Sequence, residues 1–334
     1  MPTVLITPEA MREVDGPYAQ ALRDAGFDIR YPRNPEFARG LCDTPETIDE
    51  LRDVDATIAS NEAYSEEVLR ALPRMRVIAR CGVGYDRVDV PSATARRIPV
   101  TITPTTNREA VAELALTLLL AVSKSIPAND RHVRAGRWPR DLLLPVRGRT
   151  LGIFGLGRIG CCLAVRARAL GMKVVATETA PDATFVRDHE IVLADFRTLL
   201  ASSDFVSIHC PLNDTTRGLF DEQVFSRMKR GSILINTARG AIVDEQALVA
   251  ALRSGHLAGA GLDVFQQEPP AIDNPLFEFE NVVLSPHLAG TDQASLEGMG
   301  LEAAQCIIEL FNGRWPAGAV INEQLRAEWQ RIDS

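Results

Sequence analysis

The sequence predicts an α/β protein with two parallel β-sheets. Short apolar runs alternate with amphipathic helical patterns in two separate series, which is typical of parallel strands joined by helical crossovers. A chain of 334 residues exceeds what one hydrophobic core usually supports, so we expect two domains. The expected strands are residues 4–7, 28–31, 57–60, 76–80 and 100–103 in the first series, and 151–154, 173–177, 205–209, 232–236, 258–263 and 282–285 in the second.

A long apolar helix is expected between the two series. Apolar residues recur at helical spacing over residues 111–122, and Leu116 and Leu120 extend the apolar surface to other faces. Such a helix must be buried, and we expect it to pack between domains or subunits. A membrane span is the alternative, but the run is too short and carries Glu113. The helical pattern of residues 291–311 indicates that the chain returns to the first domain.

Composition argues against several classes of protein. The chain has 36 Lys and Arg against 44 Asp and Glu, a formal charge of −8, and no basic stripe, so we expect no nucleic-acid partner. The first ten residues resemble a buried strand rather than a signal sequence, which favours a cytoplasmic protein without a membrane segment.

The scattered cysteines indicate reduced thiols, with a catalytic cysteine as the minor alternative. The histidines lack paired spacing, so we expect no metal site. These residues are Cys42, Cys81, Cys161, Cys162, Cys210 and Cys306, and His132, His189, His209, His256 and His287.

The strand at residues 151–154 runs into the glycine motif GLGRIG and then into a helical pattern. Gly155 permits a tight turn, Gly157 lets the backbone approach a pyrophosphate, and Gly160 allows close packing of helix on strand. The amides and dipole at the start of the helix attract an anion. The alternative is that the glycines form a turn with a structural role only. The acidic residue that follows the next strand argues against this alternative.

That acidic residue is Glu178, directly after the strand at residues 173–177. A carboxylate there accepts hydrogen bonds from an adenosine ribose, so the unit of strand, turn, helix, strand and acid predicts a Rossmann dinucleotide-binding domain. The charge of Glu178 would repel a 2′-phosphate, and neither Thr177 nor Thr179 supplies a cation. We therefore expect NAD rather than NADP. The alternative is a solvated glutamate at the end of a strand.

Three polar residues follow later strands of the second series. They are Arg239, Glu268 and His287, at the strand ends where parallel sheets bind ligands. Histidine can donate a proton to a carbonyl oxygen as a hydride reaches its carbon, a nearby carboxylate orients the imidazolium, and a guanidinium grips a substrate carboxylate. Each residue alone has an ordinary structural interpretation. Together they predict reversible hydride transfer between a nicotinamide and a 2-hydroxy or 2-keto acid, with His287 as general acid and base.

With these motifs, the chain resembles the D-isomer-specific 2-hydroxyacid dehydrogenases. The resemblance covers nearly the whole chain. It includes CGVGYD at residues 81–86, EAVAE at 109–113, GLGRIG at 155–160, HCPL at 209–212 and the Arg239, Glu268 and His287 segments. The resemblance implies a flavodoxin-like substrate domain, residues 1–101 with 291–334, into which a Rossmann NAD-binding domain, residues 102–290, is inserted.

The resemblance also implies roles for individual residues. Amides of Val83 and Gly84 would bind the substrate carboxylate together with Arg239 and His287, and Asp263 would bind the nicotinamide amide. Family members usually dimerise through the long apolar helix, so a homodimer is expected. The remaining cofactor-binding positions implied are Arg158, Ile159, Pro211, Thr237, Ala238 and Gly290.

The sequence departs from its relatives at two positions that bear on the substrate. The usual ribose-binding aspartate is Glu178, and Ala59 stands where phosphoglycerate dehydrogenases carry an arginine for the substrate phosphate. No C-terminal serine-sensing domain follows in this sequence. We therefore expect a small unphosphorylated acid. The alternatives are 3-phosphoglycerate dehydrogenase activity and a non-catalytic, NADH-sensing binding protein similar to the family's corepressors.

Overall fold

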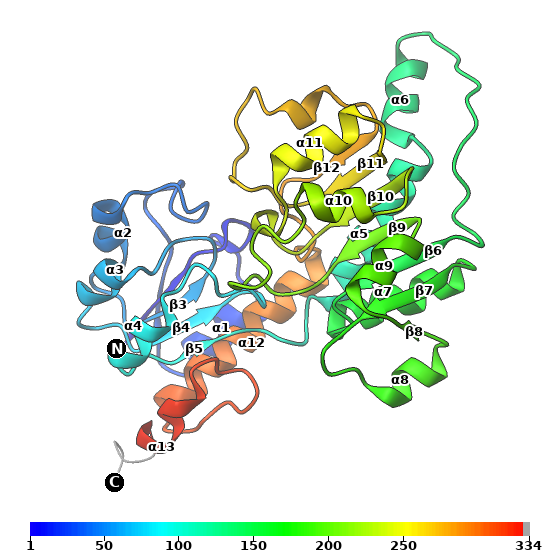
Figure 1. Ribbon diagram of the computed structural model, residues 1–334. Coiled ribbons are helices and arrows are strands. Elements are labelled where there is room, and N and C mark those ends of the chain that lie inside the picture. Colours follow the sequence, from blue (N-terminus) through cyan, green and yellow to red (C-terminus); the bar gives the residue numbers. More distant parts are fainter. Residues whose placement is uncertain (330–334) are drawn as a thin grey trace. The chain divides into compact units, whose positions relative to one another are not determined.

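The computed structural model describes residues 1–329 and confirms the predicted α/β fold class with two parallel sheets (Figure 1). Two compact units divide the chain: Met1–Asn107 together with the chain from Thr291 onward, and Arg108–Gly290. Residues 330–334, which the sequence analysis assigned to the first domain, lie outside the described residues. The assignment of residues 1–101 with 291–334 and of 102–290 to a substrate and a cofactor domain stays a prediction.

The first unit holds a five-stranded sheet in the order β2-β1-β3-β4-β5. This is the doubly wound order of flavodoxin-like folds. Val4 and Ile6 point to the face covered by α1 and α12, and Leu5 points to the face covered by α2, α3 and α4. The elements are β1 (Thr3–Ile6), α1 (Pro17–Asp24), β2 (Asp28–Arg30), α2 (Thr44–Leu51), β3 (Ala56–Ala59), α3 (Glu66–Arg70), β4 (Val77–Arg80), α4 (Val90–Ala95), β5 (Val100–Thr101), α12 (Gln293–Phe311) and α13 (Arg326–Trp329).

The second unit holds a seven-stranded sheet in the order β12-β11-β10-β9-β6-β7-β8. The strand order reverses between β6 and β9, as it does in Rossmann folds. The sequence analysis missed β8, whose two residues are exposed at the edge. The strands are β6 (Thr150–Phe154), β7 (Lys173–Thr177), β8 (Val192–Leu193), β9 (Phe205–Ile208), β10 (Ser232–Asn236), β11 (Leu257–Leu262) and β12 (Val282–Leu284).

Helices cover both faces of the second sheet. Ile233 and Ile235 pack with α5 and α7 on one face, whereas Leu234 packs with α9, α10 and α11 on the other, because successive strand residues point to opposite faces. The helices of this unit are α5 (Arg108–Ser123), α6 (Ile126–Arg134), α7 (Arg158–Ala169), α8 (Ala183–Asp188), α9 (Phe196–Ser202), α10 (Glu222–Arg227) and α11 (Glu245–Arg253). Short 3-10 turns of both units are Glu9–Met11, Gly240–Ile242, Pro275–Glu278 and Glu323–Leu325.

The long apolar helix is α5, and its own unit covers much of its apolar surface. The sheet strands β10, β11 and β12 and the helix α7 pack against it. Ala112, Leu118 and Leu119 are buried, and Leu116 and Leu120 are partly buried in the same core. Within residues 1–329, no single helix is long and apolar enough to cross a membrane. Only α5 and α6 together, bent by 56°, reach the required length and hydropathy.

Helix starts follow the sequence closely. In eight described helices an Asp or Ser before the first turn accepts a backbone N–H through its side chain, as at Asp43 of α2 and Asp292 of α12. By contrast, the residue before the first turn of α7 is Gly157, which has no side chain to cap the helix. The first-turn amides of α7 are therefore left for another acceptor.

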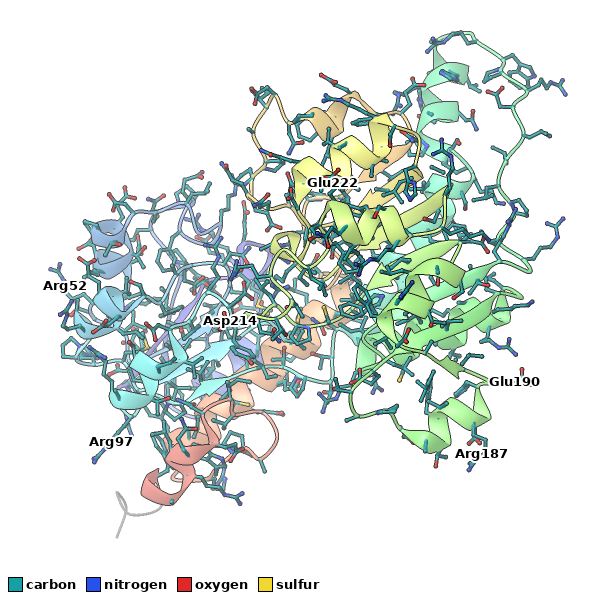
Figure 2. The ribbon with its side chains drawn as sticks, viewed as in Figure 1. Arg52, Arg97, Arg187, Glu190, Asp214 and Glu222 are labelled. Atoms are coloured by element: carbon teal, nitrogen blue, oxygen red, sulfur yellow. The ribbon has the colours of Figure 1, made fainter. Side chains whose placement is uncertain are left out.

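Charged side chains of both signs are spread over the surface of each unit (Figure 2). Arg52 and Arg97 are exposed on the first unit, and Arg187, Asp214 and Glu222 on the second. Arg187 forms an ion pair with its neighbour Asp188 in α8.

Candidate active site

The polar residues predicted for the site follow the carboxyl ends of the second sheet's strands. Because these strands are parallel, their carboxyl ends meet at one edge. The edge includes the reversal of strand order between β6 and β9, where open α/β sheets bind ligands. The predicted residues after β4, Val83 and Gly84, belong to the first unit.

The three glycines after β6 each meet a different constraint. Gly155 has a φ of +102°, and a Cβ there would lie 2.8 Å from the carbonyl carbon of His209. A Cβ on Gly160 would lie 2.2 Å from the carbonyl oxygen of Gly155, so α7 presses against the turn. A Cβ on Gly157 would meet no atom within 4 Å. The turn thus leaves open the side on which a pyrophosphate would approach, next to Arg158 and Ile159 of the first turn of α7.

Glu178 lies directly after β7, at the same edge. Its Oε1 accepts the backbone N–H of Thr179 at 2.8 Å and that of Ala180 at 3.2 Å. Burial acts to raise the pKa of Glu178, but these amides and the Thr179 hydroxyl outweigh it and hold the pKa below the usual 4.5. The side chain is a fixed, ionised acceptor beside the glycine turn.

The loop after β9 packs against the same turn. His209 is half-buried, and its Nε2 lies 2.8 Å from the Oγ of Ser207. Burial lowers the pKa of His209 to about 4, so the ring is neutral at physiological pH. Pro211 is exposed, and its carbonyl accepts the hydroxyl of Thr216 at 2.8 Å.

A buried asparagine shapes the loop that carries Arg239. The Asn236 amide donates to the carbonyl of Arg239 at 3.0 Å, and its Oδ1 accepts the N–H of Ala238 at 3.0 Å. At Gly240 a Cβ would lie 1.9 Å from the carbonyl carbon of Phe265, so only glycine lets the two loops meet. The sequence analysis missed Asn236, although a buried amide at a strand end is a recognisable signal. The Oγ1 of Thr237, also in this loop, is buried without a hydrogen-bond partner in the described chain.

Asp263, after β11, organises the loop that carries His287. It is fully buried, and its two carboxylate oxygens accept the backbone N–H groups of Leu288 and Ala289, both at 2.9 Å. Its carbonyl accepts the N–H of His287 at 2.8 Å. The sequence analysis linked Asp263 only to a nicotinamide amide, and these loop contacts were not foreseen. Gly290, another predicted position, closes this loop as the last residue of the second unit.

Glu268 and His287 are brought into direct contact. The Nδ1 of His287 lies 2.7 Å from Oε2 of Glu268, and Oε1 accepts the N–H of Phe265 at 2.9 Å. Burial acts to raise the pKa of Glu268, but the hydrogen bond and charge of His287 hold it below 4.5, with a smaller contribution from Arg239. His287 has a φ of +57°, the left-handed region that a non-glycine residue rarely adopts. The three predicted residues thus form one electrostatic group at the sheet edge.

In the first unit, the loop after β4 is held at two points. The N–H of Gly82 donates to Thr103 Oγ1 at 2.9 Å, and the Thr103 N–H donates back to the carbonyl of Gly82 at 3.0 Å. Arg80 donates through Nε to the carbonyl of Gly84 at 2.9 Å. Across residues 1–329, neither the amide of Val83 nor that of Gly84 donates to another group of the chain. Both amides can serve an anion.

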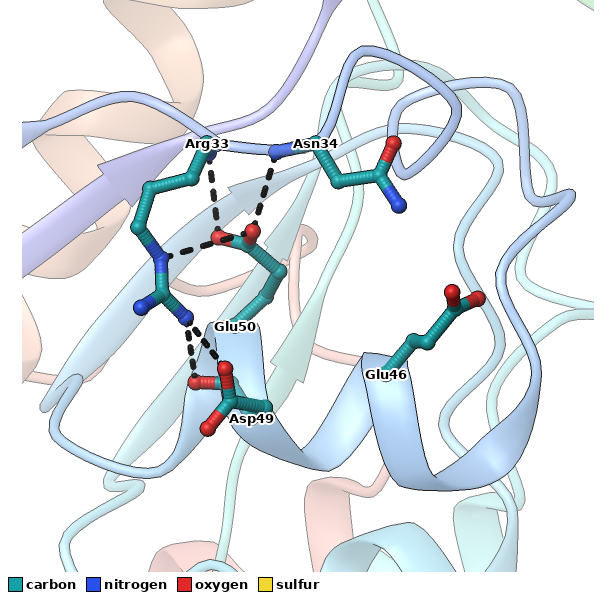
Figure 3. Close-up of a pocket in the computed structure, with 5 residues that line it drawn as sticks. All are labelled: Arg33, Asn34, Glu46, Asp49 and Glu50. Carbon is teal, nitrogen blue, oxygen red and sulfur yellow. Dashed lines mark hydrogen bonds and ion pairs between the residues drawn. The ribbon is translucent and has the colours of Figure 1, made fainter.

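A separate pocket of the first unit lies on α2 (Figure 3). Arg33 contacts Asp49 at 2.7 Å, and the carboxylate of Glu50 accepts the backbone amides of Arg33 and Asn34. In Figure 3 these groups turn toward one another, whereas Glu46 stands apart. The cluster ties a loop to a helix. No group of His, Cys, Asp and Glu among the described residues is arranged to hold a metal ion.

Comparisons with known proteins agree on one family. Residues 116–289 match the model described as the NAD-binding domain of D-isomer-specific 2-hydroxyacid dehydrogenases. The chain is 40% identical over 286 residues to a glyoxylate reductase of Korarchaeum cryptofilum, covering 84% of this chain and 86% of that protein. It is 39% identical over 271 residues to a D-3-phosphoglycerate dehydrogenase of Archaeoglobus fulgidus, covering 80% of this chain and 51% of the other. The crystal structure of D-lactate dehydrogenase from Aquifex aeolicus with NAD and lactic acid matches with a TM-score of 0.82, 27% identity and coverages of 96% and 98%.

Burial of His209 predicts a loss of stability in mild acid. Its pKa is lower in the folded chain, about 4, than in the unfolded chain, about 6.5, so the unfolded chain binds the proton first as pH falls. Stability is full above pH 6.5 and declines toward pH 4, by about 2 kcal/mol at pH 5. Urea unfolding at pH 7 and pH 5 measures this loss. His209→Gln should remove it, whereas His189→Gln, at the end of α8, should keep it. Equal losses in wild type and His209→Gln would contradict the assignment.

Proposed function

The chain belongs to the D-isomer-specific 2-hydroxyacid dehydrogenase family, and from that premise we propose that it reduces a small 2-keto acid to the D-2-hydroxy acid, with His287 supplying the proton. It is an NAD-dependent oxidoreductase of hydroxy and keto acids, with the family's NAD-binding domain in residues 116–289. The observation that carries the proposal is the contact of 2.7 Å between His287 Nδ1 and Glu268 Oε2.

The second unit fits NAD at the carboxyl edge of its sheet. The open side of Gly157 and the uncapped start of α7 suit a pyrophosphate, and Glu178 suits an adenosine ribose. The buried Oγ1 of Thr237 would gain a partner there. We assign the remaining contacts to Gly155, Arg158, Ile159, Gly160, Pro211, Ala238, Asp263 and Gly290. The bound cofactor supplies the hydride.

The chain's own residues orient the acid and move the proton. Because the ionised carboxylate of Glu268 can only accept, Nδ1 of His287 is the donor in their contact and Nε2 is left for the substrate. In reduction, Nε2 gives its proton to the keto oxygen as the carbon receives the hydride. In oxidation, Nε2 takes the proton from the hydroxyl group. Arg239 grips the carboxylate and polarises the carbonyl.

We also assign Val83 and Gly84 to binding of the substrate carboxylate. The amides of Val83 and Gly84 have no acceptor elsewhere in residues 1–329, which supports their assignment to this carboxylate. Ala59 stands where phosphoglycerate dehydrogenases carry an arginine that binds the substrate phosphate. Its side chain has no charge and is fully buried. We therefore propose a small unphosphorylated acid, of the kind named in the glyoxylate reductases.

A reducing compartment, with the cytoplasm as the proposed location, agrees with the six cysteines, which are all free. Cell fractionation with a chain-specific antibody tests it. Recovery from an oxidising compartment would refute the proposed location.

A panel of 2-keto acids with NADH tests the activity and its alternatives in one assay. Glyoxylate, hydroxypyruvate and pyruvate should be reduced, and 3-phosphohydroxypyruvate should react poorly. Reduction of the phosphorylated acid alone would favour phosphoglycerate dehydrogenase. NADH binding without turnover of any acid would favour the sensing protein.

Replacing the proposed proton donor should slow the chemical step without weakening the binding of NADH. His287→Gln should lower kcat by roughly 10²- to 10⁴-fold, the usual contribution of general acid catalysis, and leave the Kd of NADH unchanged. Steady-state kinetics and fluorescence titration measure the two quantities. His256→Gln is the control, because His256 bonds the carbonyl of Met228 just before β11, away from the carboxyl edge. Full turnover by His287→Gln would refute the role.

The charge of Glu178 should set the preference for NADH over NADPH. Glu178→Gln removes the repulsion of a 2′-phosphate and weakens the ribose contact, so the ratio of kcat/KM for NADH to that for NADPH should fall about tenfold. Glu190→Gln, an exposed change on the same unit that breaks only the ion pair with Arg168, is the matched control. An unchanged ratio would remove Glu178 from cofactor recognition.

We also propose a homodimer, for which exposed apolar side chains give a reason. Trp138 is 71% exposed and Leu142 is fully exposed in the loop after α6, which extends from the second unit in Figure 1. An interface between two copies of the chain would cover this exposed apolar surface. The double variant Trp138→Glu, Leu142→Glu should sediment as a monomer of 36.5 kDa, whereas the wild type should sediment as a dimer. The control variant Ile272→Glu, which changes another exposed apolar side chain, should remain a dimer. A monomeric wild type would contradict the proposal.

A further inference from the structure

The first unit buries a carboxylate that the proposed reaction does not use. Glu62 is 1% exposed and follows β3 by three residues. Its carboxylate accepts the hydroxyl of Thr7 at 3.0 Å, the hydroxyl of Tyr64 at 2.8 Å and the backbone N–H of Ser60 at 2.9 Å. Burying a carboxylate is unfavourable unless such donors compensate. Three residues, Thr7, Ser60 and Tyr64, therefore donate hydrogen bonds to this one carboxylate.

The acid lies where a ligand would bind in a sheet of this order. Thr7 directly follows β1, and Ser60 and Glu62 follow β3, so the group stands at the carboxyl ends of the two strands between which the order reverses. Hydroxyl and amide donors converge there as they would on a bound anion. A side chain of the chain itself fills that place, so the group serves to hold its surroundings.

Its neighbour on the next strand is Arg80. The ladder of β3 and β4 pairs Ala59 with Arg80, and Arg80 is 6% exposed. Burial raises the pKa of Glu62 and the charge of Arg80 opposes that rise, so the two groups interact. Arg80 in turn donates through Nε to the carbonyl of Gly84 at 2.9 Å. The register of β3 and β4 and their opposite charges thus link the buried Glu62 to the buried Arg80, and a hydrogen bond links Arg80 to the loop at residues 82–85.

We propose that Glu62 is a positioning residue for substrate binding, which through Arg80 fixes the Gly84 carbonyl and so aims the amides of Val83 and Gly84 at the acid's carboxylate. This rests on the proposed function, because it takes those amides as the carboxylate-binding groups. If the Glu62 charge is removed, we expect the Arg80 guanidinium to be held less firmly and its hydrogen bond to the Gly84 carbonyl, one of the loop's two anchors, to weaken. The Thr103 anchor at Gly82 remains, so the loop loosens rather than unfolds.

The test separates substrate binding from cofactor binding and chemistry. Glu62→Gln keeps the size of the side chain and removes its charge, and it should raise the KM for the keto acid about tenfold, the effect of losing one charge-assisted contact. The kcat and the Kd of NADH should stay within about twofold, because the second unit is untouched. Glu67→Gln, exposed on α3, is the matched control and should change none of the three quantities.

Arg80 supplies an independent arm. Arg80→Lys keeps the positive charge but lacks the Nε–H that donates to the Gly84 carbonyl, so it should also raise the KM for the keto acid. The double variant Glu62→Gln, Arg80→Lys should be no worse than the poorer single variant, because the two residues act in one line. Fully additive effects would overturn the relay. If Glu62→Gln does not fold, Thr7→Val removes one of its hydrogen bonds and should raise the KM about threefold.

Two outcomes of the Glu62→Gln assay overturn the inference. One is an unchanged KM for the keto acid. The other is a parallel loss in kcat and in NADH affinity, which a general structural defect would cause. Turnover by the wild type, measured in the same assay, tests the proposed function separately, so an active wild type with an unaffected variant overturns only the role of Glu62.

Discussion

The hydrogen bond between His287 and Glu268 is the interaction on which the catalytic account depends. A carboxylate has no proton to donate, so at 2.7 Å it fixes both the orientation of the imidazole and the nitrogen that carries the hydrogen. The neighbouring positive charges keep the pKa of Glu268 low although burial opposes this. The pair therefore leaves Nε2 of His287 as the nitrogen to which the proposal assigns proton transfer to a carbonyl.

This contact exists because several loops at one sheet edge are held by buried polar groups. Asp263 takes up the amides of residues 287–289 through its carbonyl and carboxylate, and Asn236 closes the loop of Arg239. Gly240 lets that loop touch the segment that leads to Glu268. The parallel sheet supplies the common edge, and these contacts bring side chains from distant parts of the sequence to within hydrogen-bond distance. The positive φ of His287 is sustained by the same contacts.

Much of this could be predicted from the sequence, because apolar periodicity and the glycine motif are local signals. All eleven predicted strands are present, whereas β8 was missed because two exposed residues leave no apolar pattern. The apolar character of α5 on several faces predicted that the helix is buried. It did not predict that the sheet of its own unit and α7 bury much of its apolar surface. The contacts of Asp263 with residues 288 and 289, and that of Glu62 with Thr7, join residues far apart in the sequence. Neither composition nor spacing encodes such pairs, so only coordinates reveal them.

The most direct test of the account is the position of the hydrogen on His287. Nitrogen-15 NMR of histidine-labelled protein at neutral pH, with the signal assigned through a His287 variant, distinguishes the two ring nitrogens. The account predicts a protonated Nδ1 bonded to Glu268, with Nε2 as the nitrogen that gains and loses its proton. A neutral ring that carries its hydrogen on Nε2 and none on Nδ1 would contradict the account, because Nδ1 could then donate no hydrogen bond to Glu268.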